Sequence, residues 1–201
     1  LRGIEKLIAK KPESEVIIGK YNSDGFPFSN SILFKKGYPN TFKTNAFISY
    51  INQLNYRPSI VWHYIIKKSL ITDNKLNFID AIIGEDEEFG ARLLCSMKSC
   101  SLYNKNYYWH RITKGGLRYS MDLKSTESYL RILLEYYKLI SKETLSYEKQ
   151  KFISSCIRFA VGEFSARIVL HNRKEINQLS LNFDKFKINS EAFLAKIKNH
   201  D

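Results

Sequence analysis

The pattern of apolar side chains changes near residue 120, and this change most constrains how the 201-residue chain can fold. Before it, short apolar runs that suit strands, such as residues 15–21, alternate with helical patterns such as residues 44–54. Strands that alternate with helices are typical of α/β proteins. We therefore predict an α/β domain over residues 1–120.

The second part of the chain has a helical period throughout. Residues 125–141 and 148–170 each place their apolar side chains on one helical face, and residues 175–181 and 190–198 are shorter helical candidates. We therefore predict an amphipathic helical extension over residues 121–201.

Local signals make further predictions in the first part. Residues 100–103 and 107–111 read as two strands joined by a hairpin turn at Asn104-Lys105-Asn106. Residues 59–70 read as a strand or short helix that leads into a helical turn. A helix is also expected after Gly84, with an acidic first turn.

Composition narrows the class of partner without choosing it. The formal net charge is +12, which favours anionic partners such as nucleic acid, acidic lipid headgroups or a phosphorylated substrate. A soluble protein that is rich in lysine would have the same net charge without any anionic partner. The three cysteines show no metal-binding or paired spacing, and no apolar run approaches the length of a membrane span. A cytoplasmic protein with reduced thiols is the expectation.

The acidic cluster Glu85-Asp86-Glu87-Glu88 has two readings. Carboxylates in the first turn of a helix are favoured by the helix dipole and by unpaired backbone N–H groups. The cluster also follows the apolar run 81–83, which places it at a strand-to-helix edge where ligands bind in open α/β sheets. Both readings stay open on these residues alone.

Three segments in this order carry a family resemblance. They are Trp62-His63-Tyr64-Ile65-Ile66-Lys67-Lys68-Ser69-Leu70, then Asn74-Lys75-Leu76-Asn77-Phe78, then Ile83-Gly84-Glu85-Asp86-Glu87-Glu88-Phe89. The aromatic segment Tyr107-Tyr108-Trp109-His110-Arg111 and a loop serine, Ser120, follow. The ordered set resembles the second, acceptor-side half of bacterial family 2 glycosyltransferases, which have the GT-A fold. The resemblance implies an incomplete GT-A-like, half Rossmann-like mixed sheet.

The resemblance also implies roles for single residues. Asp86 matches the general base of the family, and Glu85 is the neighbour that orients the site. Trp62 would form a wall of the acceptor site by stacking on a sugar, with a buried core aromatic as the plainer alternative. His110 and Arg111 would contact the donor diphosphate, and Lys114 and Arg118 would close over it from the same loop. His63 is expected to be structural.

The chain departs from the family pattern in one respect. No Asp-x-Asp metal motif occurs in it. We therefore expect a fragment of an inverting enzyme whose full-length form uses a divalent cation, Mn or Mg, with none bound by this chain alone. The expected partners are a nucleotide-sugar donor and a saccharide or lipid-linked acceptor, in polysaccharide or cell-envelope synthesis, with no nucleic acid. A peripheral contact at the inner face of the cell membrane is compatible with this reading.

The alternative is a basic module that binds nucleic acid or a membrane surface without catalysis. The charge supports it, but the basic residues are spread along the chain. No helix-turn-helix spacing, zinc motif or RNA-binding strand accompanies them.

Overall fold

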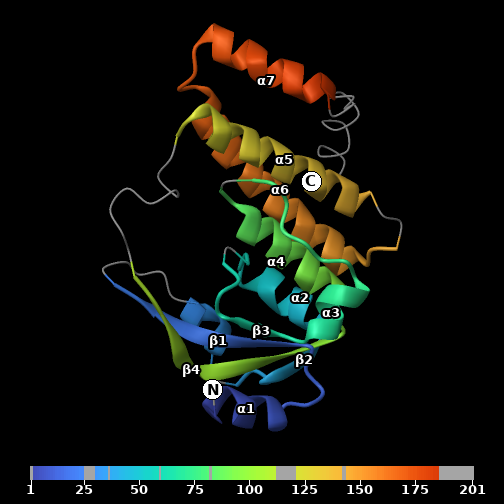
Figure 1. The fold of residues 1–201 in the computed structure, drawn as a ribbon. Helices are drawn as coiled ribbons and strands as arrows, with labels where there is room; N and C mark the ends of the chain where they lie inside the picture. The colour runs from blue at the N-terminus through green and yellow to red at the C-terminus, as the bar shows by residue number, and fades with distance from the viewer. Residues whose placement is uncertain are drawn as a thin grey trace.

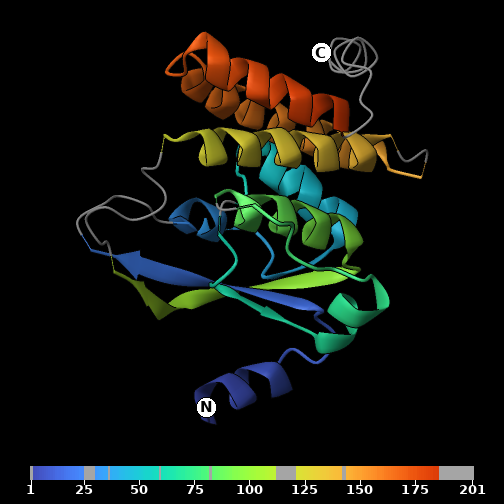
Figure 2. The same ribbon diagram turned by 45° about the horizontal axis from the view of Figure 1, so that its top comes forward.

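The computed structural model describes residues 2–24, 30–35, 37–58, 60–81, 83–111, 121–141 and 144–185. Figures 1 and 2 show a layered arrangement, with helix α1 (Arg2–Ala9) on one face of a sheet and the other main helices stacked on the opposite face. The predicted α/β class is confirmed. Within the described residues, no helix is both long enough and apolar enough to cross a bilayer.

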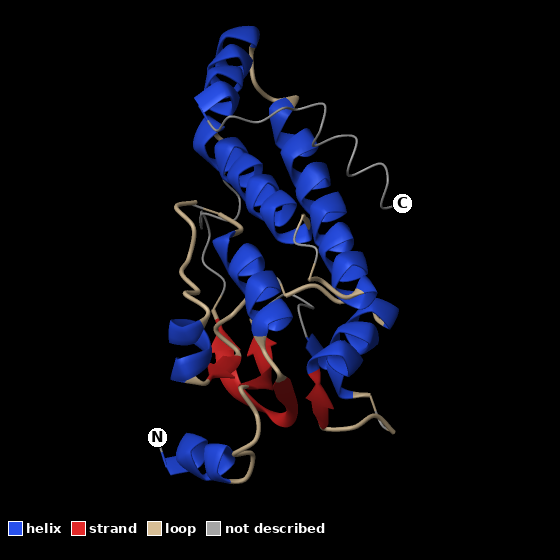
Figure 3. Ribbon diagram, turned by 90° about the vertical axis from the view of Figure 1, so that its right-hand side faces the viewer, coloured by secondary structure: helices blue, strands red, loops and turns tan. Residues whose placement is uncertain are grey.

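The sheet has four strands in the order β2-β4-β1-β3 among the described residues. Their bounds are β1 Val16–Ser23, β2 Thr41–Lys43, β3 Tyr64–Ile66 and β4 Ser99–His110. Strands β1 and β4 are parallel, whereas β3 pairs with β1 and β2 pairs with β4 in the antiparallel sense. The sheet is therefore mixed, as the resemblance implied. Figure 3 shows the strands at one end of the molecule, with the long helices extending away from them.

The predicted hairpin within residues 100–111 is wrong, because Ser99–His110 form one strand. This strand pairs with β1 from Val16↔Cys100 to Ser23↔His110, with register shifts on either side of Lys20. The polar segment Asn104-Lys105-Asn106 is accommodated as a bulge, which bends a strand without ending it. The segment also lacks the glycine that a two-residue hairpin turn favours.

The helices build one core on the sheet. Helices α2 (Thr44–Gln53) and α4 (Glu85–Ser96) lie next to the strands, and α5 (Leu123–Ile140) and α6 (Tyr147–Ile168) cover them. A single cluster of buried apolar side chains joins these layers, and it includes Val16, Phe47, Leu93, Tyr136 and Phe152. The remaining elements are a 3-10 helix η1 (Asn30–Phe34), α3 (Lys68–Asp73) and α7 (Arg173–Lys185).

The helices predicted after residue 120 agree with α5, α6 and α7. The helix expected over residues 190–198 lies outside the described residues. The domain boundary at residue 120 stays a prediction, since residues 112–120 are also outside them.

Gly84 fixes the start of α4. Its φ of 79° lies in the left-handed region, which favours glycine, and the residue is the N-cap of the helix. A Cβ added there would stand 2.6 Å from Ile132 Cδ1 of α5. The turn that leads into the Glu85-Asp86 pair is thus packed directly under the C-terminal helices.

Replacing Gly84 with alanine should lower the free energy of unfolding by about 1–2 kcal/mol, because the backbone is strained for any side chain there. The matched control is Gly162→Ala in α6, where an added Cβ meets nothing within 4 Å. That control should gain about 0.5–1 kcal/mol, because alanine is the better helix former. Urea denaturation of both variants measures the difference, and equal effects would contradict this account of Gly84.

Candidate active site

The ends of the two parallel strands are tied together at one edge of the sheet. The backbone N–H of Asp24 donates to the His110 carbonyl oxygen at 3.1 Å, and Ser23 Oγ lies 3.1 Å from His110 Nδ1. Trp109 Nε1 donates to Asp24 Oδ1 at 2.9 Å. Ligands of open α/β sheets bind outside the carboxyl ends of parallel strands. This edge is therefore where a site is expected.

Trp62 packs against the same edge. Its ring stacks on Tyr108, with ring centroids 4.2 Å apart, and on His110, with centroids 5.2 Å apart and planes within 9°. Tyr21 contacts it edge-on at 4.6 Å. Trp62 is only half-buried. The fold thus brings Trp62 and His110 together from segments that are far apart in the sequence.

His63, next to Trp62, is fully buried. Burial lowers the pKa of its imidazole to about 3, so the ring is neutral at physiological pH. Its Nε2 lies 3.4 Å from Tyr56 Oη. These features suit the structural role expected for this histidine.

Asp86 lies beside the segment that carries Trp62. Burial, followed by the negative charge of Glu85, raises the pKa of the Asp86 carboxyl to about 6. A hydrogen bond from the backbone of Val61 acts in the opposite direction without cancelling these effects. None of the ion pairs found among the described residues includes Asp86. The carboxylate is half-buried and is held by the residue that precedes Trp62.

The other two carboxylates of the acidic cluster face the protein. Glu88 is fully buried, and Arg92 reaches its two oxygens at 2.5 and 2.7 Å. Burial raises the pKa of Glu88, while Arg92 opposes the shift. Glu87 is 6% exposed and lies near Tyr136 and Cys156. The cluster therefore divides into a structural pair, Glu87 and Glu88, and a half-buried pair, Glu85 and Asp86.

The structure describes only one of the remaining predicted site residues. Arg111 is exposed directly after β4. Lys114, Arg118 and Ser120 lie outside the described residues. In the ranges that the structure covers, no three His, Cys, Asp or Glu side chains converge as metal ligands. The divalent cation expected in the full-length enzyme stays a prediction.

Sequence reasoning missed three residues of this edge. Tyr21 and Tyr108 contact the Trp62 ring, and Asp24 accepts a hydrogen bond from Trp109. Tyr108 and His110 are two positions apart and so share a face of a strand, which is a signal in the sequence. Tyr21 and Asp24 have no such local signal, because their role depends on the pairing of β1 with β4.

Comparison with known proteins supports the fold. No family model and no curated protein matches the sequence. The structure of S. aureus TarS residues 1–349 in complex with UDP-GlcNAc matches with a TM-score of 0.53 and 19% identity over 86% of this chain and 46% of that one. A second structure of TarS 1–349 matches with a TM-score of 0.48 and 17% identity over 87% of this chain and 44% of TarS. This chain therefore has an α/β fold similar to that of TarS, and spans less than half of the matched TarS chain.

The raised pKa of Asp86 can be tested directly. We expect its side-chain carboxyl carbon to titrate with a midpoint of about 6 in an NMR pH series. Glu85→Gln should lower this midpoint, because it removes a neighbouring negative charge. Glu5→Gln, on the exposed side of α1, is the matched control and should leave it unchanged. An Asp86 midpoint near its ordinary value of 3.8 in the unmodified protein would contradict the description of this site.

Proposed function

We propose that this chain is the acceptor-side part of an inverting family 2 glycosyltransferase, with Asp86 as its general base. The observation that carries the proposal is the half-buried Asp86 carboxyl, whose pKa is raised to about 6, beside the Trp62 segment. The structure of TarS, which has the similar fold, contains UDP-GlcNAc, a nucleotide-sugar. The ordered motifs around Trp62 and Asp86 support the same family.

The chemistry requires one carboxylate at the acceptor hydroxyl. A sugar hydroxyl is too weak an acid to ionise before it reacts, so a base must take its proton as the oxygen attacks the anomeric carbon. A base works best when its pKa lies near the working pH, because it is then mostly ionised and still basic. Asp86 meets this condition at neutral pH. Attack from the face opposite the leaving nucleoside diphosphate inverts the anomeric configuration.

The neighbours of Asp86 take supporting roles in this proposal. Glu85 keeps the pKa of Asp86 high through its charge. Trp62 is proposed to stack on the apolar face of an acceptor sugar. His110, which stacks on Trp62, is proposed to contact the donor diphosphate. Arg111 offers a planar guanidinium that can bind two oxygens of a diphosphate, and Lys114 and Arg118 are proposed to act with it.

The proposed function also requires a donor, an acceptor and a metal ion. The donor is a nucleotide-sugar, and the acceptor is a saccharide or a lipid-linked saccharide in cell-envelope glycan synthesis at the cytoplasmic side of the membrane. In the full-length enzyme a divalent cation would neutralise the leaving diphosphate. Among the described residues, no group of three or more His, Cys, Asp or Glu side chains could hold this cation.

Asp86→Asn should lower sugar transfer by about 10²–10⁴-fold, since the amide cannot accept the proton. The rate of sugar transfer is measured with the longest form of the protein that has transfer activity. In the unmodified enzyme, kcat/KM should fall as the pH drops below about 6, where Asp86 becomes protonated. The variant should lose this pH dependence.

The fold should not suffer from this substitution. The folded protein binds the Asp86 proton more tightly than the unfolded chain does, so the free energy of unfolding falls as pH rises from about 4 to about 6. Asp86→Asn removes this loss and should be at least as stable as the unmodified protein at pH 7. Asp80→Asn is the control, because its side chain is 99% exposed. Near-normal transfer by Asp86→Asn would show that the base is another residue.

A further inference from the structure

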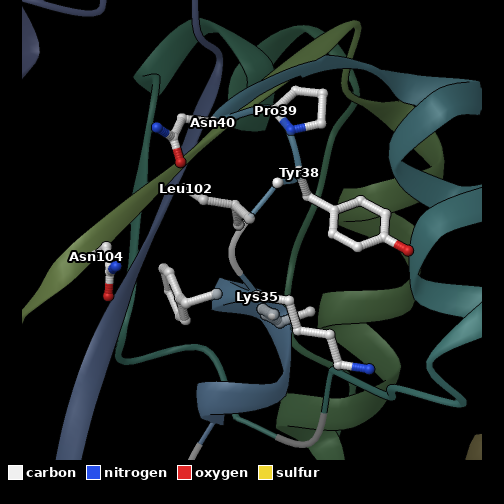
Figure 4. Close-up of a pocket in the computed structure, with 9 residues that line it drawn as sticks. Lys35, Tyr38, Pro39, Asn40, Leu102 and Asn104 are labelled. Carbon is white, nitrogen blue, oxygen red and sulfur yellow. The ribbon is translucent and has the colours of Figure 1, made fainter.

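A cavity lies on the sheet, away from the strand ends against which Trp62 packs. Its volume is about 210 Å³, and it is lined by the end of η1, by the segment that follows η1 and by residues of β4. Strand β2 pairs with β4 only at residues 99–101, so the edge of β4 from Leu102 onward borders the cavity. Figure 4 shows Asn40 and Asn104 on one side of it, with Lys35 and Tyr38 on the other.

The loop that forms one wall is held in place by several independent contacts. The Tyr38 ring packs on Tyr50 with centroids 4.6 Å apart, and Tyr50 Oη donates to the Leu33 carbonyl oxygen at 2.9 Å. The Asn40 carbonyl oxygen accepts from the Leu102 N–H at 2.7 Å. Gly37, with a φ of 89°, allows the turn between these anchors. The wall is therefore formed before any ligand arrives, which lowers the entropy lost on binding.

The side chains that line the cavity suit a saccharide. Asn40 and Asn104 are exposed, and neither amide takes part in a hydrogen bond between described residues. An amide presents both donors and an acceptor, as sugar hydroxyls require. Phe34 and Leu102 supply apolar surface beside these amides. The cavity is smaller than the roughly 300–1,000 Å³ of sites for drug-sized ligands, and so suits a single sugar ring.

The charged side chains in and beside the cavity are positive. Lys35 lines it, and Lys20 Nζ lies 5.1 Å from the centre of the Phe34 ring, which is another part of the wall. None of the described lining residues is Asp or Glu. A cleft lined by charge of one sign attracts ligands of the opposite sign.

We propose that this cavity is a subsite for a sugar unit that carries an anionic group, either a carboxylate or a phosphate. Asn40 and Asn104 bind its hydroxyls, and Lys35 binds its charge. The distance along β4 from Asn104 to His110 is about 20 Å. A ligand that fills the cavity and also reaches the strand ends must therefore be longer than one sugar. That this unit belongs to the acceptor rests on the proposed function, whereas its binding does not.

The test follows the side-chain amide signals of Asn40 and Asn104 in the ¹⁵N-labelled chain during titration. The probes are glucuronate, glucose 6-phosphate, glucose and inorganic phosphate, each at millimolar concentration. We expect one or both of the anionic sugars to shift these signals, and the one that binds identifies the anionic group. Glucose and inorganic phosphate should each bind at least about fivefold more weakly, because each lacks half of the contacts.

Matched variants locate the binding. Asn104→Ala should weaken binding of the anionic sugar about fivefold, whereas Asn106→Ala, an exposed asparagine of the same strand outside the cavity lining, should not. Lys35→Gln should remove the preference for the anionic sugar over glucose, with Lys105→Gln as its control. Any one of three results would overturn the proposal. Glucose and the anionic sugars could bind equally, neither could bind, or Asn104→Ala and Asn106→Ala could have equal effects. Asp86→Asn should bind as the unmodified chain does, so this result is independent of the general base.

Discussion

The parallel pairing of β1 with β4 is the contact on which the rest of the structure depends. It joins residues more than 80 positions apart, from Val16↔Cys100 to Ser23↔His110, and sets both carboxyl ends at one edge of the sheet. That edge provides the surface for Trp62, which stacks on Tyr108 and His110. The same strand, at Leu102 and Asn104, also lines the cavity described above. One long strand therefore links the candidate active site and this cavity.

The acidic turn of α4 shows how one segment can serve both stability and chemistry. Glu88 is neutralised by Arg92 in the interior, as a buried carboxylate requires. Asp86 has no such cation among the described residues, and its partial burial beside Glu85 disfavours its charged form. A half-buried acid of this kind lowers the stability of the fold at neutral pH, whereas an exposed acid would not. Such a loss of stability is typical of functional sites. Gly84 holds this turn against α5.

The sequence was informative where local signals decide the structure. The glycine and the acidic turn predicted the start of α4, and the apolar periods predicted α5 and α6, because these depend on neighbours along one helix. It failed at β4, since an Asn-Lys-Asn segment looks like a turn unless a parallel partner is known to continue past it. The stacking of Trp62 on His110 and the raised pKa of Asp86 could not be derived either. Both arise from packing between distant segments, and burial is not visible in a single sequence.

The most direct measurement of the central claim is the position of the acceptor hydroxyl in a structure of the enzyme with its acceptor bound. The account predicts that the attacking oxygen lies within hydrogen-bonding distance, about 2.6–3.2 Å, of a carboxylate oxygen of Asp86. It also predicts that the acceptor sugar packs on Trp62. An acceptor bound with its reactive oxygen near a different base, and with Asp86 out of reach, would contradict the account.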